Sequence, residues 1–254
     1  MSRTPRTLLV VPCYNEASRL DLAAFRAFAA SDSSVAFLFV NDGSSDATVD
    51  RLRELEAGDR EAFAVLDLPR NSGKAEAVRL GLGVAFKSNA GYVGYWDADL
   101  ATPLDEIARF VSVLERLPGI EVVFGARVQL LGRSVRRSPV RHYLGRIFAT
   151  AVSAVLGLPI YDTQCGAKLM RRTARLEAIF ATPFGVNWTF DVELLARLIR
   201  ARAGTDLPPA REVVYELPLE RWHDVAGSKV KPTDFFVAFF EIARIWYRYR
   251  GRGE

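Results

Sequence analysis

Residues 92–103 read Tyr-Val-Gly-Tyr-Trp-Asp-Ala-Asp-Leu-Ala-Thr-Pro and join an apolar run to a polar turn. The first five residues have the length and the β-rich composition of a buried strand. Thr102 and Pro103 are typical of the cap and the first position of a helix, and Asp105 is placed to complete a capping box. The stretch therefore predicts a strand that ends in two aspartates, followed by a helix from Pro103 to Leu117.

Apolar, β-rich runs of the same kind recur on both sides of this stretch. They lie at Leu8–Val11, Val35–Val40, Phe63–Leu68 and Val122–Phe124. Most of them are separated by segments with helical periodicity, at Leu20–Ala30, Thr48–Ala57 and Ala75–Ser88. Strands that alternate with helices predict an α/β protein with a single Rossmann-like, mostly parallel sheet flanked by helices.

The second half of the chain has a different rhythm. An arginine-rich loop follows Gly125, and the predicted elements after it are helices at about Tyr143–Leu156 and Phe190–Arg202, a strand at Glu212–Leu217 and a terminal helix. No repeat or linker separates these segments from the first half. We therefore expect one domain over residues 1–232, divided at about residue 100, and a C-terminal amphipathic helix over 233–254.

The chain has 254 residues, 50% hydrophobic and 25% charged, which excludes disordered and fibrous proteins. Two cysteines exclude a disulfide framework and a four-cysteine zinc site, and they favour a reducing compartment. Met1–Arg6 is polar, and the apolar run after it is too short for a secretory signal. The longest uncharged stretch, Ile147–Tyr161, has 15 residues, fewer than the roughly 20 that span a bilayer. These features favour a cytoplasmic location.

The net charge of +4 is concentrated in one part of the chain. Between Val122 and Tyr161 there are six arginines and no Asp or Glu, so the remaining residues sum to −2. The six are Arg127, Arg133, Arg136, Arg137, Arg141 and Arg146. Such a local excess indicates an anionic partner, the alternative being a solvated basic loop. Nucleic acid is not expected, because no series of aromatic residues for base stacking accompanies the arginines.

Polar residues follow four of the predicted strands, where an open parallel sheet binds its ligands. They are Pro12-Cys13-Tyr14-Asn15-Glu16, the run from Asn41 to Asp46, the run from Arg70 to Lys74, and Asp97-Ala98-Asp99. The third run lacks the first glycine and the hydroxyl residue of a Walker loop. Lys74 is therefore either a solvated lysine at a helix start or, as part of this set, a phosphate or base contact.

Asp97 and Asp99 are one residue apart, so both carboxylates can point to the same side of an extended segment. They repel each other unless a cation or ligand donors lie between them. A hard divalent ion such as Mg²⁺ or Mn²⁺, itself bound to a diphosphate, fits these oxygen ligands. The alternative is that one aspartate caps the next helix, but Thr102 is better placed for that. His142 and His223 each lack a second histidine at ligand spacing.

Seven motifs between Leu8 and Pro232, in this order and spacing, resemble a family 2 glycosyltransferase of GT-A fold. The first four are Pro-Cys-Tyr-Asn-Glu (12–16), Asn-Asp-Gly-Ser-Ser-Asp-Ala-Thr (41–48), Asn-Ser-Gly-Lys-Ala-Glu-Ala-Val (71–78) and Asp-Ala-Asp-Leu-Ala-Thr (97–102). The last three resemble the branch of dolichyl-phosphate glucosyltransferases and polyprenyl-phosphate glycosyltransferases. They are Asp-Thr-Gln-Cys-Gly-Ala-Lys (162–168), Trp-Thr-Phe-Asp-Val-Glu (188–193) and Gly-Ser-Lys (227–229).

The resemblance implies a role for each matching residue. A nucleotide-sugar donor would be bound by Pro12, Tyr14, Glu16, Asp42, Lys74 and Asp97, and Mg²⁺ or Mn²⁺ by Asp99 with Asp97. The implied catalytic residues are Arg127 at the phosphates, Asp191 and Glu193 at the reacting centre, and Lys229 on a closing segment. The acceptor phosphate would meet Arg133, Arg136, Arg137, Arg141 and Gln164. Residues 1–100 then form the nucleotide half and 101–232 the acceptor half.

Two positions depart from the pattern of the relatives. Position 41 is Asn where many have Asp, and Asp42 keeps the second carboxylate. Position 101 is Ala, as in glucosyl-transferring relatives, whereas mannosyl-transferring relatives carry a metal-binding Gln. The second departure favours UDP-glucose over GDP-mannose as the donor.

The resemblance implies inverting transfer of a hexose to a polyprenyl or dolichyl phosphate at the cytoplasmic membrane face. A lipid phosphate oxygen is already anionic and needs no strong base, whereas a hydroxyl acceptor would need Asp191 or Glu193 as one. Such a hydroxyl acceptor on a glycan or small molecule, GDP-mannose as donor, and a binding protein without catalysis are the alternatives. The last is disfavoured because the metal, phosphate and reacting-centre motifs are all retained.

The terminal helix has aromatic residues at helical spacing, including Phe239, Phe240, Trp246 and Tyr247. An aromatic face beside arginines fits a helix that lies peripherally on a membrane surface. A contact in a homo-oligomer and packing against the domain are open alternatives. The pattern leaves Glu241, Arg244 and Arg248 elsewhere on the surface.

Overall fold

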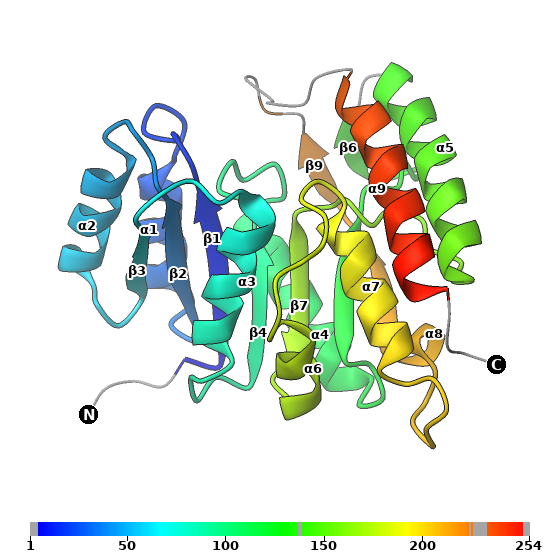
Figure 1. Cartoon of the computed structure of the whole chain (residues 1–254). Coiled ribbons are helices and arrows are strands. Elements are labelled where there is room, and N and C mark those ends of the chain that lie inside the picture. The colour runs from blue at the N-terminus through cyan, green and yellow to red at the C-terminus, as the bar shows by residue number, and fades with distance from the viewer. Residues whose placement is uncertain (1–4, 137–138, 224, 226–232, 251–254) are drawn as a thin grey trace.

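The computed structural model describes residues 5–136, 139–223, 225 and 233–250, and a seven-stranded sheet lies at its centre (Figure 1). The strands are β1 (Thr7–Cys13), β2 (Val35–Asp42), β3 (Phe63–Leu68), β4 (Tyr92–Trp96), β5 (Val122–Ala126), β7 (Ala167–Arg171) and β8 (Val214–Pro218). Their order is β3-β2-β1-β4-β7-β5-β8. Neighbours are parallel except at β7, which is antiparallel to β4 and β5. The predicted α/β fold with a mostly parallel sheet is confirmed.

Helices cover both faces of the sheet, because alternate residues of a strand point to opposite sides. On one face, Leu9 and Val11 of β1 belong to a core with α1 (Leu22–Ser31), α2 (Thr48–Gly58) and α4 (Ile107–Arg116). On the other face, Val10 belongs to a core with α3 (Lys74–Ala85), α5 (Pro139–Leu156), α6 (Ala174–Ile179), α7 (Phe190–Arg200) and α9 (Thr233–Tyr249). Figure 1 shows α5 and α9 side by side beyond α7.

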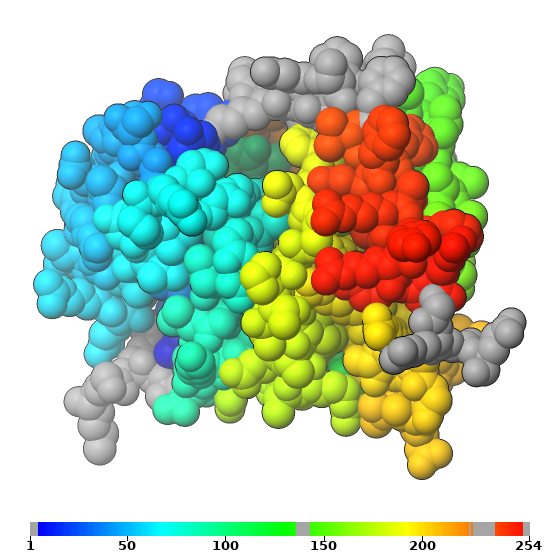
Figure 2. Space-filling model, in the orientation of Figure 1, coloured from blue at the N-terminus to red at the C-terminus, as the bar shows by residue number. Residues whose placement is uncertain are grey.

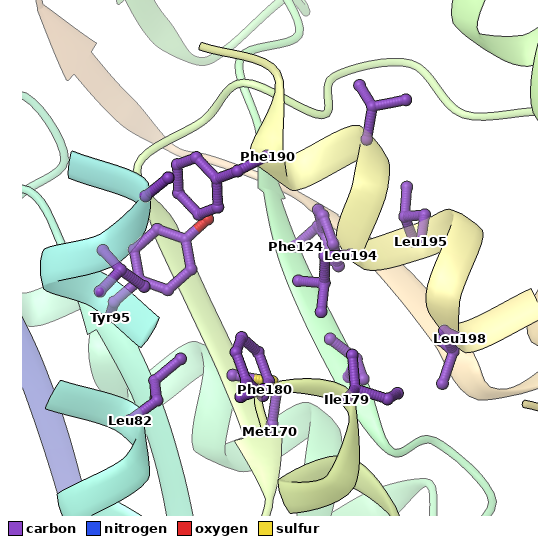
Figure 3. Close-up of a cluster of buried hydrophobic side chains, with 14 of the residues drawn as sticks. Leu82, Tyr95, Phe124, Met170, Ile179, Phe180, Phe190, Leu194, Leu195 and Leu198 are labelled. Atoms are coloured by element: carbon purple, nitrogen blue, oxygen red, sulfur yellow. The ribbon is translucent and has the colours of Figure 1, made fainter. Parts of the chain in front are cut away.

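The core on the second face brings three strands against α7. Tyr95 of β4 and Phe190 of α7 have ring centroids 5.8 Å apart. Phe124 of β5 and Met170 of β7 are buried in the same cluster (Figure 3). Figure 3 shows the hydroxyl of Tyr95 pointing toward the N-terminal end of α7. A polar atom therefore leaves the core at the point where α7 begins.

The predicted start of the fourth helix is wrong. The backbone after Pro103 forms a 3-10 turn, η1 (Leu104–Glu106), and α4 begins only at Ile107, without a side-chain cap at its first turn. Thr102 is instead drawn into the core, where its carbonyl accepts a hydrogen bond from the Trp96 indole at 2.8 Å. The capping box is replaced by contacts that hold the turn against β4.

Two short strands and two short helices were not predicted from the sequence, nor was β7. The strands β6 (Ser134–Arg136) and β9 (Arg221–His223) pair in parallel, and the short helices are α6 and α8 (Ala210–Val213). The sequence did not predict β7 because the five residues of this strand include Lys168 and Arg171. Charged residues break the apolar pattern that identifies a buried strand. The side chains of Lys168 and Arg171 bind groups that are distant in the sequence, among them Asp191 for Lys168 and the Ile120 carbonyl for Arg171.

The terminal helix is confirmed, but it packs by a different face from the aromatic one. Ala238, Ile242 and Ile245 are buried, whereas Phe240 is 78% and Tyr247 72% exposed. Figure 2 shows α9 on the outer surface beside α7. Packing against its own domain therefore does not account for Phe240 and Tyr247 of the aromatic face.

Candidate active site

A pocket lies beyond the carboxyl ends of β4 and β5, with Asp97 and Asp99 after β4 and Arg127 after β5 in its lining. Open α/β sheets bind ligands outside the carboxyl ends of the strands. The pocket has a volume of about 330 Å³, which is in the range of small-molecule sites. Six of the predicted site residues line it: Lys74, Asp97, Asp99, Arg127, Gln164 and Asp191.

Asp97 and Asp99 occupy the turn after β4. The backbone N–H of Asp97 donates to the Gly166 carbonyl at 2.9 Å, and Asp99 Oδ1 accepts from the Ala101 N–H at 3.1 Å. Leu100, directly after Asp99, has a φ of 53°, and its N–H donates to the Asp97 carbonyl at 3.3 Å, so the segment is a tight turn and not the predicted extended strand end. Gly166 is required beside this turn, because a Cβ there would overlap the Asp97 carboxylate.

These two carboxylates fit a hard divalent cation that is shared with a diphosphate. Burial and the neighbouring Asp97 charge both raise the pKa of Asp99, so the two groups repel each other. Within the described ranges, no cluster of three or more His, Cys, Asp or Glu side chains is arranged to hold a metal. Asp97 and Asp99 would therefore supply part of the ligand set, and oxygens of the diphosphate the rest.

Lys74 begins α3 and faces the aspartates. Its Nζ lies 2.6 Å from Asp97 Oδ1. Burial is the largest influence and lowers the pKa of the ammonium, but Asp97, Asp191 and Asp99 together outweigh it, so that the net shift of the pKa is upward. Asp42 holds the preceding loop, because its two carboxylate oxygens accept the N–H groups of Ser72 at 2.7 Å and Gly73 at 2.8 Å. A cationic side chain is thereby presented to the metal-binding carboxylates.

Pro12, Tyr14, Glu16 and Asp42 lie at the ends of β1 and β2, next to the pocket but outside the lining that the structure describes. Tyr14 is 39% exposed. Glu16 is buried and receives two hydrogen bonds from Arg19, at 2.8 and 2.9 Å. The contacts of Glu16 and Asp42 shape this edge, and nucleoside binding by all four stays a prediction.

Asp191 lies in the first turn of α7, and one side chain each from β4 and β7 holds its carboxylate. Its Oδ1 accepts a hydrogen bond from the Tyr95 hydroxyl and lies 3.0 Å from Lys168 Nζ. Lys168 is completely buried and also donates to the carbonyls of Thr163 at 3.0 Å and Cys165 at 2.6 Å. The ion pair therefore joins α7 to the loop that carries Gln164. A lysine inside an otherwise apolar run was the sequence signal for this contact.

Glu193 does not meet Asp191 at the pocket. It is 1% exposed, and its carboxylate accepts hydrogen bonds from the Gly185 N–H at 2.7 Å and the Tyr249 hydroxyl at 2.8 Å. Arg197 donates two more, at 3.1 and 2.9 Å. These bonds tie α7 to α9 and to the loop before α7. A role for Glu193 at the reacting centre remains a prediction. In the structure its carboxylate faces Gly185, Arg197 and Tyr249 and not the pocket.

Arg127 is fixed by Asp162, which the sequence analysis did not assign to the site. Its Nε and Nη2 donate to the Asp162 carboxylate at 2.7 and 2.8 Å. Burial alone would lower the pKa of Arg127, but Asp162 raises it overall, so the guanidinium stays charged. The N–H groups of Tyr161 and Asp162 donate in turn to Glu216 at 2.9 and 2.8 Å. Two acidic residues thus orient one pocket arginine.

Among the remaining basic residues predicted for the site, the structure describes the side chain of Arg133 alone. Arg133 donates to the Pro218 carbonyl. Arg136 and Arg141 are placed only by their backbones, in β6 and α5, while Arg137 and Lys229 lie outside the described residues. Arg146 does line the pocket, with its guanidinium carbon 4.2 Å from the Tyr161 ring centroid. The charge count contained Arg146, but no motif distinguished it.

The pocket has an apolar lining at the end away from Asp97 and Asp99. Its apolar lining includes Phe148 and Ala149 of α5, Ala238 of α9 and Trp188 in the loop before α7. Phe148 and Phe239 hold α5 against α9, with ring centroids 6.4 Å apart. One cavity therefore joins a charged end to an apolar end between two surface helices.

Residues 8–177 match the family described as "Glycosyl transferase family 2". The chain belongs to this family. It is 30% identical to a dolichyl-phosphate β-glucosyltransferase of Trichomonas vaginalis, over 96% of this chain and 72% of that protein. It is 32% identical to a dolichyl-phosphate β-glucosyltransferase of Drosophila melanogaster, over 95% of this chain and 74% of that one.

Solved structures with the same fold include glucosyl-3-phosphoglycerate synthase from Mycobacterium tuberculosis. The structure with Mn²⁺, UDP-glucose and phosphoglyceric acid has a TM-score of 0.65 and 16% sequence identity, and the match covers 98% of this chain and 81% of that one. The structure with Mn²⁺, UDP and glucosyl-3-phosphoglycerate has a TM-score of 0.65 and 17% identity, with the same coverage. The fold of this family 2 glycosyltransferase is therefore the GT-A fold.

Proposed function

We propose that this glycosyltransferase transfers glucose from UDP-glucose to a polyprenyl or dolichyl phosphate, with inversion at the anomeric carbon. The observation that carries the proposal is a pocket that continues from the donor-side Asp97 and Asp99, past the cationic Arg127 and Arg146, to an apolar end between α5 and α9. A lipid phosphate fits the two arginines and the apolar end, because its headgroup is anionic and its chain is apolar. The dolichyl-phosphate β-glucosyltransferases that this chain resembles support the same acceptor.

The donor would occupy the nucleotide half, residues 1 to about 100. Asp99 and Asp97 would hold Mg²⁺ or Mn²⁺, as the Mn²⁺ complexes of the M. tuberculosis synthase with UDP or UDP-glucose suggest. When bound, the metal stabilises the negative charge that develops on the leaving diphosphate. Lys74, with its Nζ 2.6 Å from Asp97 Oδ1, would add positive charge beside the same group. Ala101, in place of a metal-binding Gln, supports UDP-glucose over GDP-mannose.

The acceptor would occupy the second half, residues 101–232, with its phosphate among Arg127, Arg146 and Gln164. Its oxygen is anionic and can attack without a strong base, so these groups need only orient it. Asp191 Oδ1 is already engaged by Lys168 and by the Tyr95 hydroxyl, which supports a structural role for this oxygen. A hydroxyl acceptor is the second candidate, and it would need Asp191 as the base.

A lipid acceptor requires the enzyme to meet a membrane surface. Among the described residues, none of the helices has the length and hydropathy to cross a bilayer. The exposed aromatic face of α9 instead supports peripheral association at the cytoplasmic face, and Arg250 lies over Trp246 at 4.2 Å and Tyr247 at 5.0 Å. Co-sedimentation with anionic vesicles tests this. A protein that stays in the supernatant but self-associates would show that the face is a contact between copies.

The transferase proposal is tested by incubating the full chain with Mn²⁺, labelled UDP-glucose and a short polyprenyl phosphate. We expect label in the lipid phase, and less of it with labelled GDP-mannose. A soluble sugar or glycerate acceptor serves as the control for a hydroxyl nucleophile. Transfer to that acceptor without transfer to the lipid would refute the lipid assignment.

A further inference from the structure

Glu241 of α9 gathers the backbone of the loop that leads into α7. Its Oε1 accepts the N–H groups of Asn187 at 3.0 Å and Trp188 at 3.3 Å. Its Oε2 accepts the Thr189 N–H at 2.7 Å and the Thr189 hydroxyl at 2.9 Å. One carboxylate from the C-terminal helix therefore binds three successive N–H groups. The sequence analysis placed Glu241 elsewhere on the surface, which is wrong.

This contact supplies a helix cap that α7 lacks locally. Thr189 is the N-cap residue of α7, yet its side chain makes no capping bond within the helix. Of the three N–H groups that Glu241 accepts, that of Thr189 is one of the unpaired donors at the start of α7, while those of Asn187 and Trp188 belong to the loop before it. A carboxylate at this end of the helix is favourable in the field of the helix dipole. Glu241 thus fixes the junction between the loop and α7, although it lies 52 residues after Thr189 in the chain.

The residues that this cap fixes are those of the acceptor end of the pocket. Asn187 and Trp188 line the pocket, and Asp191 follows within the first turn of α7. Glu241 is itself held in place, because Ala238, Ile242 and Ile245 are buried beside it on α9. Ala238 also lines the pocket, one turn before Glu241. The donor residues at the ends of β1 and β2 are not part of this arrangement.

We propose that Glu241 is a positioning residue for transfer, which sets Trp188 and Asp191 against the acceptor through the backbone of residues 187–189. The inference rests on the proposed function, since it names what organises the acceptor end of that site. Glu241 acts through hydrogen bonds to the loop and touches no reacting atom. It also makes α9, whose other face is exposed and aromatic, part of the pocket's support. Loss of Glu241 then impairs use of the acceptor and leaves binding of the donor intact.

The test compares Glu241→Ala and Glu241→Gln in the full chain, with Glu61→Ala at an exposed turn as the matched control. Transfer to a short polyprenyl phosphate gives kcat/KM for the acceptor, and calorimetry with Mn²⁺ gives the Kd of UDP-glucose. We expect Glu241→Ala to lower kcat/KM about ten- to hundredfold, with the Kd changed less than about twofold. Glu241→Gln keeps one acceptor oxygen and should fall between, while Glu61→Ala should match the wild type.

Two outcomes would overturn the positioning role. One is wild-type kcat/KM in Glu241→Ala, and the other is a loss of UDP-glucose affinity in step with the loss of transfer, which a general loss of structure would cause. Amide hydrogen exchange at residues 187–191 separates this proposal from the proposed function. If the wild type transfers nothing to lipid, the function fails, while faster exchange there in Glu241→Ala still supports the cap. Unchanged exchange contradicts the cap whatever the activity.

Discussion

The two ends of the pocket are supported in different ways. At the donor end, Asp97, Asp99 and Lys74 lie in short motifs directly after strands, and Asp42 holds the loop that carries Lys74. At the acceptor end, Asp191 is held by side chains of β4 and β7, and the loop before it by α9. Groups at strand ends can thus be located from motifs. Groups on a helix depend on partners that are distant in the sequence.

The largest expected effect comes from removing the buried cation at the acceptor end. Lys168→Met leaves Asp191 near Tyr95 without its ion-pair partner, and uncompensated burial of a charge costs about 3–5 kcal/mol. We expect the free energy of unfolding to fall by that amount in urea titrations followed by circular dichroism. The double variant Lys168→Met with Asp191→Asn should recover part of the loss. A single variant within about 1 kcal/mol of wild type would show that the ion pair does not support this end.

A substitution at Gly166 tests the donor end without replacing a charged residue. A Cβ at Gly166 overlaps the Asp97 carboxylate, so Gly166→Ala must displace it. We expect Mn²⁺-dependent UDP-glucose affinity to fall about tenfold or more, measured by calorimetry. Gly83→Ala in α3 is the matched control, because a Cβ there meets nothing within 4 Å. Equal affinity in the two variants would contradict the geometry of the aspartate turn.

The smallest effect concerns repulsion between the two aspartates. The pKa of Asp99 is raised in the folded state above its unfolded value near 3.8, so ionisation of Asp99 lowers the free energy of unfolding. This loss is absent at pH values below 3.8 and is complete at pH values above the folded pKa. Asp99→Asn should therefore be more stable than wild type at pH 7, by up to about 1 kcal/mol, and equal to it at pH 3. Thermal unfolding at both values checks the sign. Greater stability of wild type at pH 7 without metal would mean that Asp99 is not repelled there.

Position 41 illustrates a departure from the family pattern that has a structural reason. Asn41 donates through Nδ2 to Asp67 Oδ1 at 2.7 Å. An aspartate at position 41 would place two carboxylates at this distance and repel Asp67. The amide is therefore matched to its neighbour on β3, a relation that a motif of consecutive residues does not contain.

The four strands of the first half, their parallel pairing and the polar strand ends followed from apolar runs and turn residues alone, as did the existence of β5. These signals are local, since a buried strand needs consecutive apolar residues and a strand end needs polar ones. The strand-end pattern singled out Lys74, Asp97 and Asp99, and the family resemblance added Arg127, Gln164 and Asp191; all six line the pocket. The apolar pattern missed β7, because Lys168 and Arg171 interrupt it. The resemblance placed Glu193 beside Asp191 at the reacting centre, but residues two apart on a helix face different ways, and Glu193 binds Tyr249 instead.

The sequence by itself determined the family 2 fold, the charged donor motifs and an aromatic terminal helix. Only the tertiary structure decided which side chains hold the acceptor end. Lys168, Glu216 and Glu241 look like ordinary charged residues in the chain, yet each binds a segment of the pocket more than four residues away. The physical reason is that a buried charge must find its partner in space. That partner comes from another strand or helix, at a position that no local pattern encodes.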